Sequence, residues 1–214
     1  MGWSRQVRLP FTDRAEAGRL LAEEVMALRL VDPLVLALPR GGVPVGREIA
    51  RRLDAPLDVL VTRKIGCPGQ PELGVGAIAE GGEPVFDADL MRRLGLTNAD
   101  LEETVHRERA ELARRVTAYR GDRSLPSVKG RDVVVVDDGL ATGGTARAAL
   151  TAVRAGEPGR VVLAVPIGAA QTVKALAGDA DEIVVLAAPW TFRAVGQWYV
   201  RFDQLSDQDV QRLL

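Results

Sequence analysis

Short apolar runs alternate with amphipathic stretches along most of the chain. A run that is apolar at every position indicates a strand covered on both faces, as in a parallel sheet. The stretches between the runs carry apolar residues at helical spacing and predict covering helices, the first of them capped by Thr12 or Asp13. This alternation predicts an α/β fold with a mainly parallel open sheet flanked by helices. The predicted strands cover residues 34–38, 57–61, 133–136, 161–165 and 182–186.

The stretch between the second and third apolar runs predicts a hairpin followed by a helical insertion. The hairpin pairs residues 75–79 with residues 83–86. The insertion covers about 87–120, with a short helix first and a longer helix starting at Asn98. Acidic and basic residues nearly balance on the longer helix, which favours a solvated face over a nucleic-acid site and predicts that His106 lies at the surface.

Length and composition fit this fold and argue against several classes of protein. The 214 residues suit a single domain over 1–214, with a core over about 13–187 and a tail over about 188–214. A net charge of −1 gives no general attraction to nucleic acid or to an acidic membrane. One cysteine excludes an internal disulfide, and one histidine argues against a histidine-based metal site. Without a long apolar segment or a targeting pattern, we expect a soluble cytoplasmic protein.

Candidate chemistry centres on residues 133–145, which read VVVVDDGLATGGT. The four valines predict a buried strand, so Asp137 and Asp138 follow its carboxyl end, where ligands bind in open α/β sheets. Adjacent carboxylates repel each other, and the pair therefore needs hydroxyl donors or a cation nearby. A ribose diol with a magnesium ion would provide both.

The loop after the two acids is suited to an anion. Gly139, Gly143 and Gly144 allow backbone torsions that let successive N–H groups converge, and Thr142 and Thr145 add hydroxyl donors. A helix that starts near Thr145 adds its positive dipole end, worth roughly 0.3–1 kcal/mol for an exposed anionic charge. A bare turn between strand and helix would not need the paired carboxylates, so the pattern favours a phosphate site.

Four hydrophobic residues, two acids and a Gly/Thr loop resemble the phosphoribosyl pyrophosphate signature of the type I phosphoribosyltransferases. The match is complete over 133–145. The resemblance implies the fold of that family, with a small hood formed by the tail. It implies that Asp137 and Asp138 hold the ribose 2′ and 3′ hydroxyls. It also implies that the 5′-phosphate is bound by the loop residues Gly139, Leu140, Ala141, Thr142, Gly143, Gly144 and Thr145.

The segment LPRGG follows the first predicted strand and has two interpretations. Arg40, Gly41 and Gly42 could present a guanidinium and backbone N–H groups to a diphosphate. They could equally form an ordinary turn with an exposed arginine. The resemblance favours the first interpretation, because the corresponding loop of the family contacts pyrophosphate. It also implies a cis peptide between Pro39 and Arg40.

A second cationic pair, Arg63 and Lys64, follows the second predicted strand. Residues 65–73 after it are rich in Gly and Pro and predict an irregular, mobile loop. The pair and the loop resemble the catalytic flexible loop of the family, which implies that both cations meet the diphosphate. The alternative is two solvated cations before a surface loop. Cys67 has no histidine near it in the sequence, so a catalytic thiol is not expected.

Together these resemblances imply a phosphoribosyltransferase that uses phosphoribosyl pyrophosphate and magnesium, with a nitrogen acceptor that we expect to be a nucleobase. Magnesium prefers phosphate, sugar and water oxygens, so we expect the substrate to hold it, near Asp137 and Asp138, with no direct protein ligand. No residue stands out as a general base. Two alternatives remain: a regulator that binds phosphoribosyl pyrophosphate without transferring it, and a hydrolase that uses water as acceptor.

The tail is richer in aromatic residues than the rest of the chain. Its aromatic side chains could stack on a flat acceptor base, or they could pack the tail onto the edge of the sheet. Hood sequences diverge within the family, so no acceptor contact can be assigned by resemblance. Dimers are common in the family, and the resemblance therefore implies a homodimer. Five of the nine aromatic residues fall here: Trp190, Phe192, Trp198, Tyr199 and Phe202.

Overall fold

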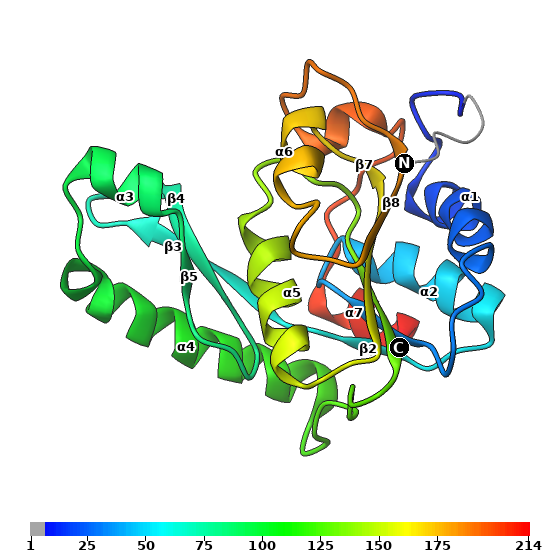
Figure 1. The fold of residues 1–214 in the computed structure, drawn as a ribbon, viewed down its shortest axis with the longest axis horizontal. Helices are drawn as coiled ribbons and strands as arrows, with labels where there is room; N and C mark the ends of the chain where they lie inside the picture. The colour runs from blue at the N-terminus through cyan, green and yellow to red at the C-terminus, as the bar shows by residue number, and fades with distance from the viewer. Residues whose placement is uncertain (1–6) are drawn as a thin grey trace.

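The computed structural model describes residues 7–214, and its centre is a five-stranded sheet (Figure 1). Every pair of neighbouring strands is parallel, which confirms the predicted α/β fold with a mainly parallel sheet flanked by helices. The central strand β6 lies between β1 and β7, so its carboxyl end opens onto the middle of one sheet edge. In spatial order the strands are β2 (Leu57–Val59), β1 (Leu34–Ala37), β6 (Asp132–Val136), β7 (Arg160–Ile167) and β8 (Glu182–Ala187).

Helices cover both faces of this sheet. On one face lie α1 (Arg14–Met26), capped by Asp13 as predicted, and α2 (Gly42–Leu53). On the other face lie α5 (Gly144–Ala155) and α6 (Ala170–Ala175). Alternate residues of β6 divide between the two sides, with Val133 and Val135 in the cluster beneath α5 and Val134 and Val136 beneath α1 and α2. The uninterrupted valines therefore reflect two buried faces, as predicted.

A second unit, which we call the arm (residues 62–120), projects from the sheet (Figure 1). It holds an antiparallel sheet and two helices, and Ala77 and Ala79 of its long strand pack against α5. The predicted hairpin between residues 75–79 and 83–86 and the two helices of the insertion are present. The elements of the arm are β3 (Thr62–Cys67), β4 (Gln70–Ala79), β5 (Val85–Phe86), α3 (Ala88–Leu94) and α4 (Asn98–Arg120).

The prediction that residues 65–73 are irregular was wrong. β3 and β4 pair as a hairpin that turns at Pro68 and Gly69, where Gly69 has a φ of 77°. Register shifts flank Gly66 in the ladder, and a Cβ at Gly66 would lie 2.5 Å from the Pro71 carbonyl oxygen. Bulges and glycines of this kind let a strand tolerate residues that would break a regular ladder.

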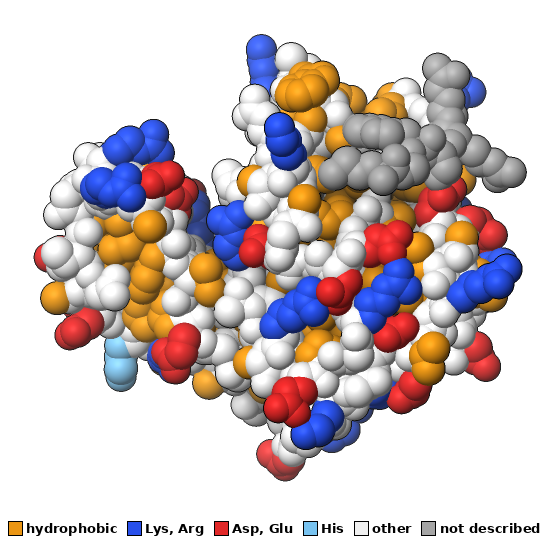
Figure 2. Space-filling model, in the orientation of Figure 1, with side chains coloured by type: hydrophobic (Ala, Val, Ile, Leu, Met, Phe, Trp, Pro, Cys, Tyr) orange, Lys and Arg blue, Asp and Glu red, His pale blue; other side chains and the backbone are white. Residues whose placement is uncertain are grey.

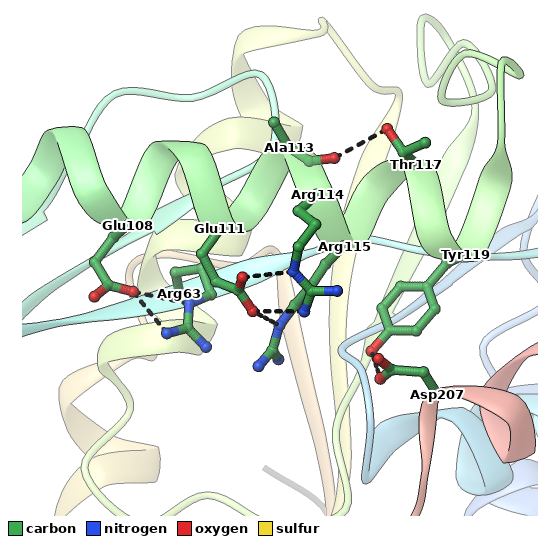
Figure 3. A network of polar contacts seen from close by, with 9 residues as sticks. All are labelled: Arg63, Glu108, Glu111, Ala113, Arg114, Arg115, Thr117, Tyr119 and Asp207. Atoms are coloured by element: carbon green, nitrogen blue, oxygen red, sulfur yellow. Dashed lines mark hydrogen bonds and ion pairs between the residues drawn. The ribbon is translucent and has the colours of Figure 1, made fainter.

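The long helix α4 ties the arm to the core (Figure 3). Along it, Glu111 accepts hydrogen bonds from Arg114 and Arg115, while near its end the Tyr119 hydroxyl donates to Asp207 at 2.6 Å. The last residue of the helix, Arg120, is buried and pairs with Asp58 and Glu80. The arm is therefore held at its base by buried polar contacts as well as by apolar packing.

The C-terminal tail packs back onto the core rather than extending from it. Phe11 and Tyr199 form a parallel bridge, and the Phe11 N–H donates to the Trp198 carbonyl at 2.8 Å. Two short helices were not predicted: η1 (Val195–Trp198) and α7 (Asp207–Leu213). Helix α7 begins with a capping box between Ser206 and Asp209 and packs against α2 and α4.

His106 is exposed on α4, as predicted. Across residues 7–214, none of the helices combines the length and the apolar character needed to cross a bilayer. The expectation that the first residues carry no targeting pattern falls largely on residues 1–6, which lie outside the described residues.

Candidate functional site

Strand β6 places Asp137 and Asp138 at the middle of the carboxyl edge of the sheet. Asp137 is half-buried and Asp138 is buried. The Asp138 backbone N–H donates to the Asp137 Oδ1 at 2.8 Å, so the first carboxylate folds back over the start of the loop. The backbone N–H of Asp137 donates to the Ala164 carbonyl at 3.4 Å, which continues the parallel pairing with β7.

Both carboxyls are electrostatically unfavourable in this position. Burial, and secondly the charge of Asp138, raise the pKa of Asp137 well above its ordinary value. Burial also raises the pKa of Asp138, although Arg14 opposes this effect. Hydroxyl donors or a cation at the exposed side of the pair would stabilise its ionised form, which is what a ribose diol and a divalent ion offer.

Arg14, the first residue of α1, contacts the acid pair from the far end of the chain. Its Nε donates to Asp138 Oδ2 at 2.8 Å, with both side chains 12% exposed. Its guanidinium also lies 3.8 Å from the centre of the Phe202 ring, and its Nη1 donates to the Asp203 carbonyl at 2.9 Å. Sequence reasoning missed this residue, because one arginine in the first turn of an amphipathic helix gives no signal that distinguishes it from a solvated cation.

The loop after the acids leads directly into α5. Gly143 has a φ of 80° and is the N-cap of the helix, and Gly144 and Thr145 are its first two residues. Ala141, Thr142 and Gly144 are exposed. The N-terminal end of α5 thus faces outward beside the acid pair, with the free N–H groups that favour an anion.

Contacts with neighbouring loops fix the shape of this segment. Leu140 pairs with Gly168, and the Ala141 carbonyl accepts a hydrogen bond from the Thr172 hydroxyl at 2.6 Å. A Cβ on Gly139 would lie 2.4 Å from Val195 of the tail, so that position requires glycine. The first part of the loop, Gly139 and Leu140, is therefore enclosed between the core and the tail.

The loop after β1 packs against the same two acids. The peptide between Pro39 and Arg40 is cis, as the resemblance implies. A Cβ on Gly41 would lie 2.0 Å from Asp138 Oδ2, and one on Gly42 would lie 2.5 Å from the Val136 carbonyl oxygen. Arg40 itself is exposed. The structure therefore brings the predicted diphosphate loop into contact with the predicted ribose acids.

Arg63 and Lys64 belong to a different group of side chains in the arm. Arg63 Nη2 lies 2.7 Å from Glu108 Oε2 of α4, and the Lys64 ammonium donates to the Glu72 carbonyl (Figure 3 shows the Arg63 pair). Both cations line a cavity of about 750 Å³ between the hairpin and α4. Neither Asp137 nor the loop after it lines this cavity, so the diphosphate role of these two cations stays a prediction. The residues that line the cavity all belong to the arm, and Figure 2 shows a hollow between the arm and the body of the protein.

The aromatic residues of the tail divide between the two interpretations. Tyr199 is 5% exposed, stacks on Phe202 with ring centres 5.1 Å apart, and donates its hydroxyl to the Asp138 carbonyl at 2.6 Å. Burial raises the pKa of this tyrosine. Trp190, by contrast, is 79% exposed. Packing therefore explains Tyr199 and Phe202, and it places the tail beside the acid pair.

Within residues 7–214, no group of three or more His, Cys, Asp or Glu side chains is arranged to hold a metal ion. The acid pair offers two carboxylates, one of which Arg14 already contacts. A magnesium ion that takes most of its ligands from a substrate and from water fits such a donor set, since magnesium retains water and seldom occupies an all-protein cage.

Comparison with known proteins places this geometry in a family. Residues 13–196 match the phosphoribosyl transferase domain family. A Mycobacterium tuberculosis protein named "Putative phosphoribosyl transferase Rv0571c" is 48% identical over 204 residues, which are 95% of this chain and 46% of that protein. The chain thus spans about half the length of the curated relatives that it matches.

Solved structures give the same result for the fold. The crystal structure of TT1426 from Thermus thermophilus superposes with a TM-score of 0.81 at 46% identity, covering 95% of this chain and 96% of that one. The AQ2163 protein from Aquifex aeolicus shares the fold at a TM-score of 0.51 and 16% identity, covering 81% of this chain and 73% of that one. The family model matches residues 13–196, which are most of the chain. This chain therefore belongs to the phosphoribosyl transferase family.

Proposed function

We propose that the protein transfers ribose 5-phosphate from phosphoribosyl pyrophosphate to a ring nitrogen of a nucleobase and releases pyrophosphate. One observation carries the proposal: Gly41 approaches Asp138 so closely that the candidate diphosphate loop and the candidate ribose acids form a single surface. The outward-facing start of α5 completes this surface with an anion site.

In this proposal, the ribose lies over the acid pair. Asp137 and Asp138 accept hydrogen bonds from the 2′ and 3′ hydroxyls, and the segment from Gly139 to Thr145 binds the 5′-phosphate. The bond between the anomeric carbon and pyrophosphate breaks, and its electron pair leaves with pyrophosphate. The nitrogen lone pair forms the new bond, and the nitrogen loses its proton to solvent. The carboxylates offset the positive charge that develops on the ring.

The leaving group needs cations. Arg40, exposed on the loop that contacts Asp138, is available to the diphosphate. Arg63 and Lys64 would have to exchange their contacts with Glu108 and Glu72 for the diphosphate, which requires the hairpin to move toward the acids. Closure of this kind would exclude water from the reaction.

Magnesium fits the same surface. It would be bound mainly by diphosphate and ribose oxygens near Asp137 and Asp138, where it would neutralise charge on the leaving group. For the acceptor we propose a flat nucleobase, as the family resemblance implies. We further propose that residues 1–214 form one domain and that the protein lies in the cytoplasm. The family resemblance implies a homodimer.

Pyrophosphate release tests the proposal. The protein is incubated with phosphoribosyl pyrophosphate, MgCl₂ and each member of a panel of purine and pyrimidine bases. We expect release that depends on one class of base and a nucleotide product that accounts for it. Release that is equal with and without every base would indicate a hydrolase, and binding without release would indicate a sensor; either result would contradict the transferase.

A matched pair of variants makes the test specific to the site. Replacing both acids, Asp137→Asn with Asp138→Asn, should abolish release. Asp122→Asn removes one carboxylate from an exposed turn after α4 and should leave release unchanged. Equal activity of the two proteins would contradict the assignment of the acids.

A further inference from the structure

The contact between Arg14 and Asp138 joins three parts of the chain that are remote in sequence. Arg14 begins α1, Asp138 follows β6, and Phe202 and Asp203 belong to the tail. The guanidinium donates to the carboxylate and to the Asp203 carbonyl, and it stacks over the Phe202 ring at 3.8 Å. A side chain with three such partners has little rotational freedom, so it presents its Nε to Asp138 in a fixed direction.

This fixed contact commits one oxygen of the carboxylate. Oδ2 of Asp138 accepts the hydrogen bond from Arg14, and the whole carboxylate lies beside Gly41. A carboxylate accepts through two oxygens, and the one that Arg14 does not contact is Oδ1. The charge of Arg14 also compensates the buried acid, which a neutral partner would not do.

We propose that Arg14 is a positioning residue, which orients Asp138 so that Oδ1 accepts a hydroxyl of the ribose diol, and which couples the tail to this acid. The inference rests on the proposed function, because it assigns Asp138 to a diol. It predicts a specific defect: loss of Arg14 weakens the binding of ligands that present the diol and leaves the binding of ligands without a diol unchanged.

Calorimetric titration in MgCl₂ separates these cases with two ligands, phosphoribosyl pyrophosphate and inorganic pyrophosphate. Arg14→Gln should weaken the binding of phosphoribosyl pyrophosphate about tenfold, the equivalent of about 1.4 kcal/mol. It should leave pyrophosphate affinity unchanged. Arg14→Lys keeps the charge and should recover part of the loss. The matched control is Arg19→Gln, which removes an exposed arginine from the same helix and should change neither affinity.

A double substitution shows whether Arg14 acts through the acid. Arg14→Gln combined with Asp138→Asn should bind phosphoribosyl pyrophosphate no more weakly than Asp138→Asn alone, because the acid that Arg14 positions is already lost. Melting temperatures of all variants report whether they remain folded. If the two losses multiply, or if Arg14→Gln weakens both ligands equally, Arg14 only supports the fold and the proposal is overturned.

Failure of the proposed function gives a different result. If the unsubstituted protein does not bind phosphoribosyl pyrophosphate, the role of Arg14 is overturned together with the function, whereas binding without pyrophosphate release overturns only the transfer. If the unsubstituted protein binds phosphoribosyl pyrophosphate and Arg14→Gln binds it with the same affinity, only the role of Arg14 is overturned.

Discussion

Gly41 and Asp138, which are 97 positions apart in the sequence, are packed so closely that a Cβ on the glycine would fall 2.0 Å from the carboxylate Oδ2. A separation this short forces either the loop or the acid to move if any side chain is added. Gly41→Ala should therefore weaken phosphoribosyl pyrophosphate binding about tenfold or more, since small displacements of positioning groups are costly.

The same substitution at an open position is the control for this prediction. Gly178 follows α6 and has no atom within 4 Å of an added Cβ, so Gly178→Ala should leave binding unchanged. Calorimetry measures both affinities. Normal affinity in Gly41→Ala would show that the contact between loop and acid does not matter for the donor.

Tyr199 tests the link between the tail and the site. Tyr199→Phe removes the buried hydroxyl that donates to the Asp138 carbonyl, which should cost about 1–3 kcal/mol of unfolding free energy because the carbonyl loses its partner. Since that carbonyl belongs to Asp138, one of the two acids proposed to bind the ribose, the affinity for phosphoribosyl pyrophosphate should fall as well. Urea unfolding and calorimetry measure the two effects.

Tyr119→Phe is the matched substitution, because its hydroxyl donates to Asp207 between α4 and α7 rather than to the acid pair. It should lower stability while leaving donor affinity intact. A result in which both tyrosines affect affinity equally would contradict a specific link through Tyr199.

Much of the fold follows from local sequence signals. The four valines of β6, the Asp13 cap and the apolar stripe of α4 are each contained in one short segment, so periodicity and capping rules find them. The error over residues 65–73 has a local cause too: Gly and Pro were interpreted as breaking the strands, whereas register shifts accommodate them. Helix α7 was missed although its Ser206 capping box is visible in the sequence.

Only those parts of the site that lie within one short segment could be predicted from the residues themselves. The acids and the loop after them lie in a single run, and Gly41 was found through resemblance. The ion pair between Arg14 and Asp138 joins residues 124 positions apart, and no periodicity or spacing connects them. The placement of Arg63 against Glu108 likewise depends on how the arm folds back, which the composition of neither β3 nor α4 reveals.

Arg120 provides a test of the base of the arm. Its side chain is 1% exposed and pairs with Asp58 and Glu80, and burial raises the pKa of Glu80 even beside this cation. Arg120→Met leaves both acids without their buried partner and should lower the unfolding free energy by about 3–5 kcal/mol. Urea unfolding measures the loss.

Arg114→Met serves as the comparison, because Arg114 is 59% exposed and solvent screens its pair with Glu111, so the loss of stability should be much smaller. Similar losses in the two variants would show that the buried network at Arg120 does not hold the arm.

Glu111 makes stability depend on pH in a defined direction. Hydrogen bonds from Arg114, and then from Arg115, lower the pKa of Glu111 from its ordinary 4.5 to about 2. Because the unfolded chain binds this proton more readily, the carboxylate stabilises the fold above about pH 4.5, and the effect is lost as the pH falls through about 2. The pair is partly solvated, so the contribution should stay below about 1 kcal/mol.

Comparing Glu111→Gln with the unsubstituted protein tests this direction. The variant should be slightly less stable at neutral pH, and the difference should shrink as the pH falls toward 2. Glu102→Gln, at an exposed position of the same helix, should show a smaller difference. A deficit for Glu111→Gln that grows on acidification would contradict the assigned sign.

The central claim is that the acid pair after β6 binds the ribose of phosphoribosyl pyrophosphate. Calorimetric titration of this compound in MgCl₂, into the unsubstituted protein and into the variant with Asp137→Asn and Asp138→Asn, tests it most directly. We predict saturable binding to the first and none to the second, with both proteins folded. Equal affinity for the two proteins, or no binding to the unsubstituted one, would contradict the claim.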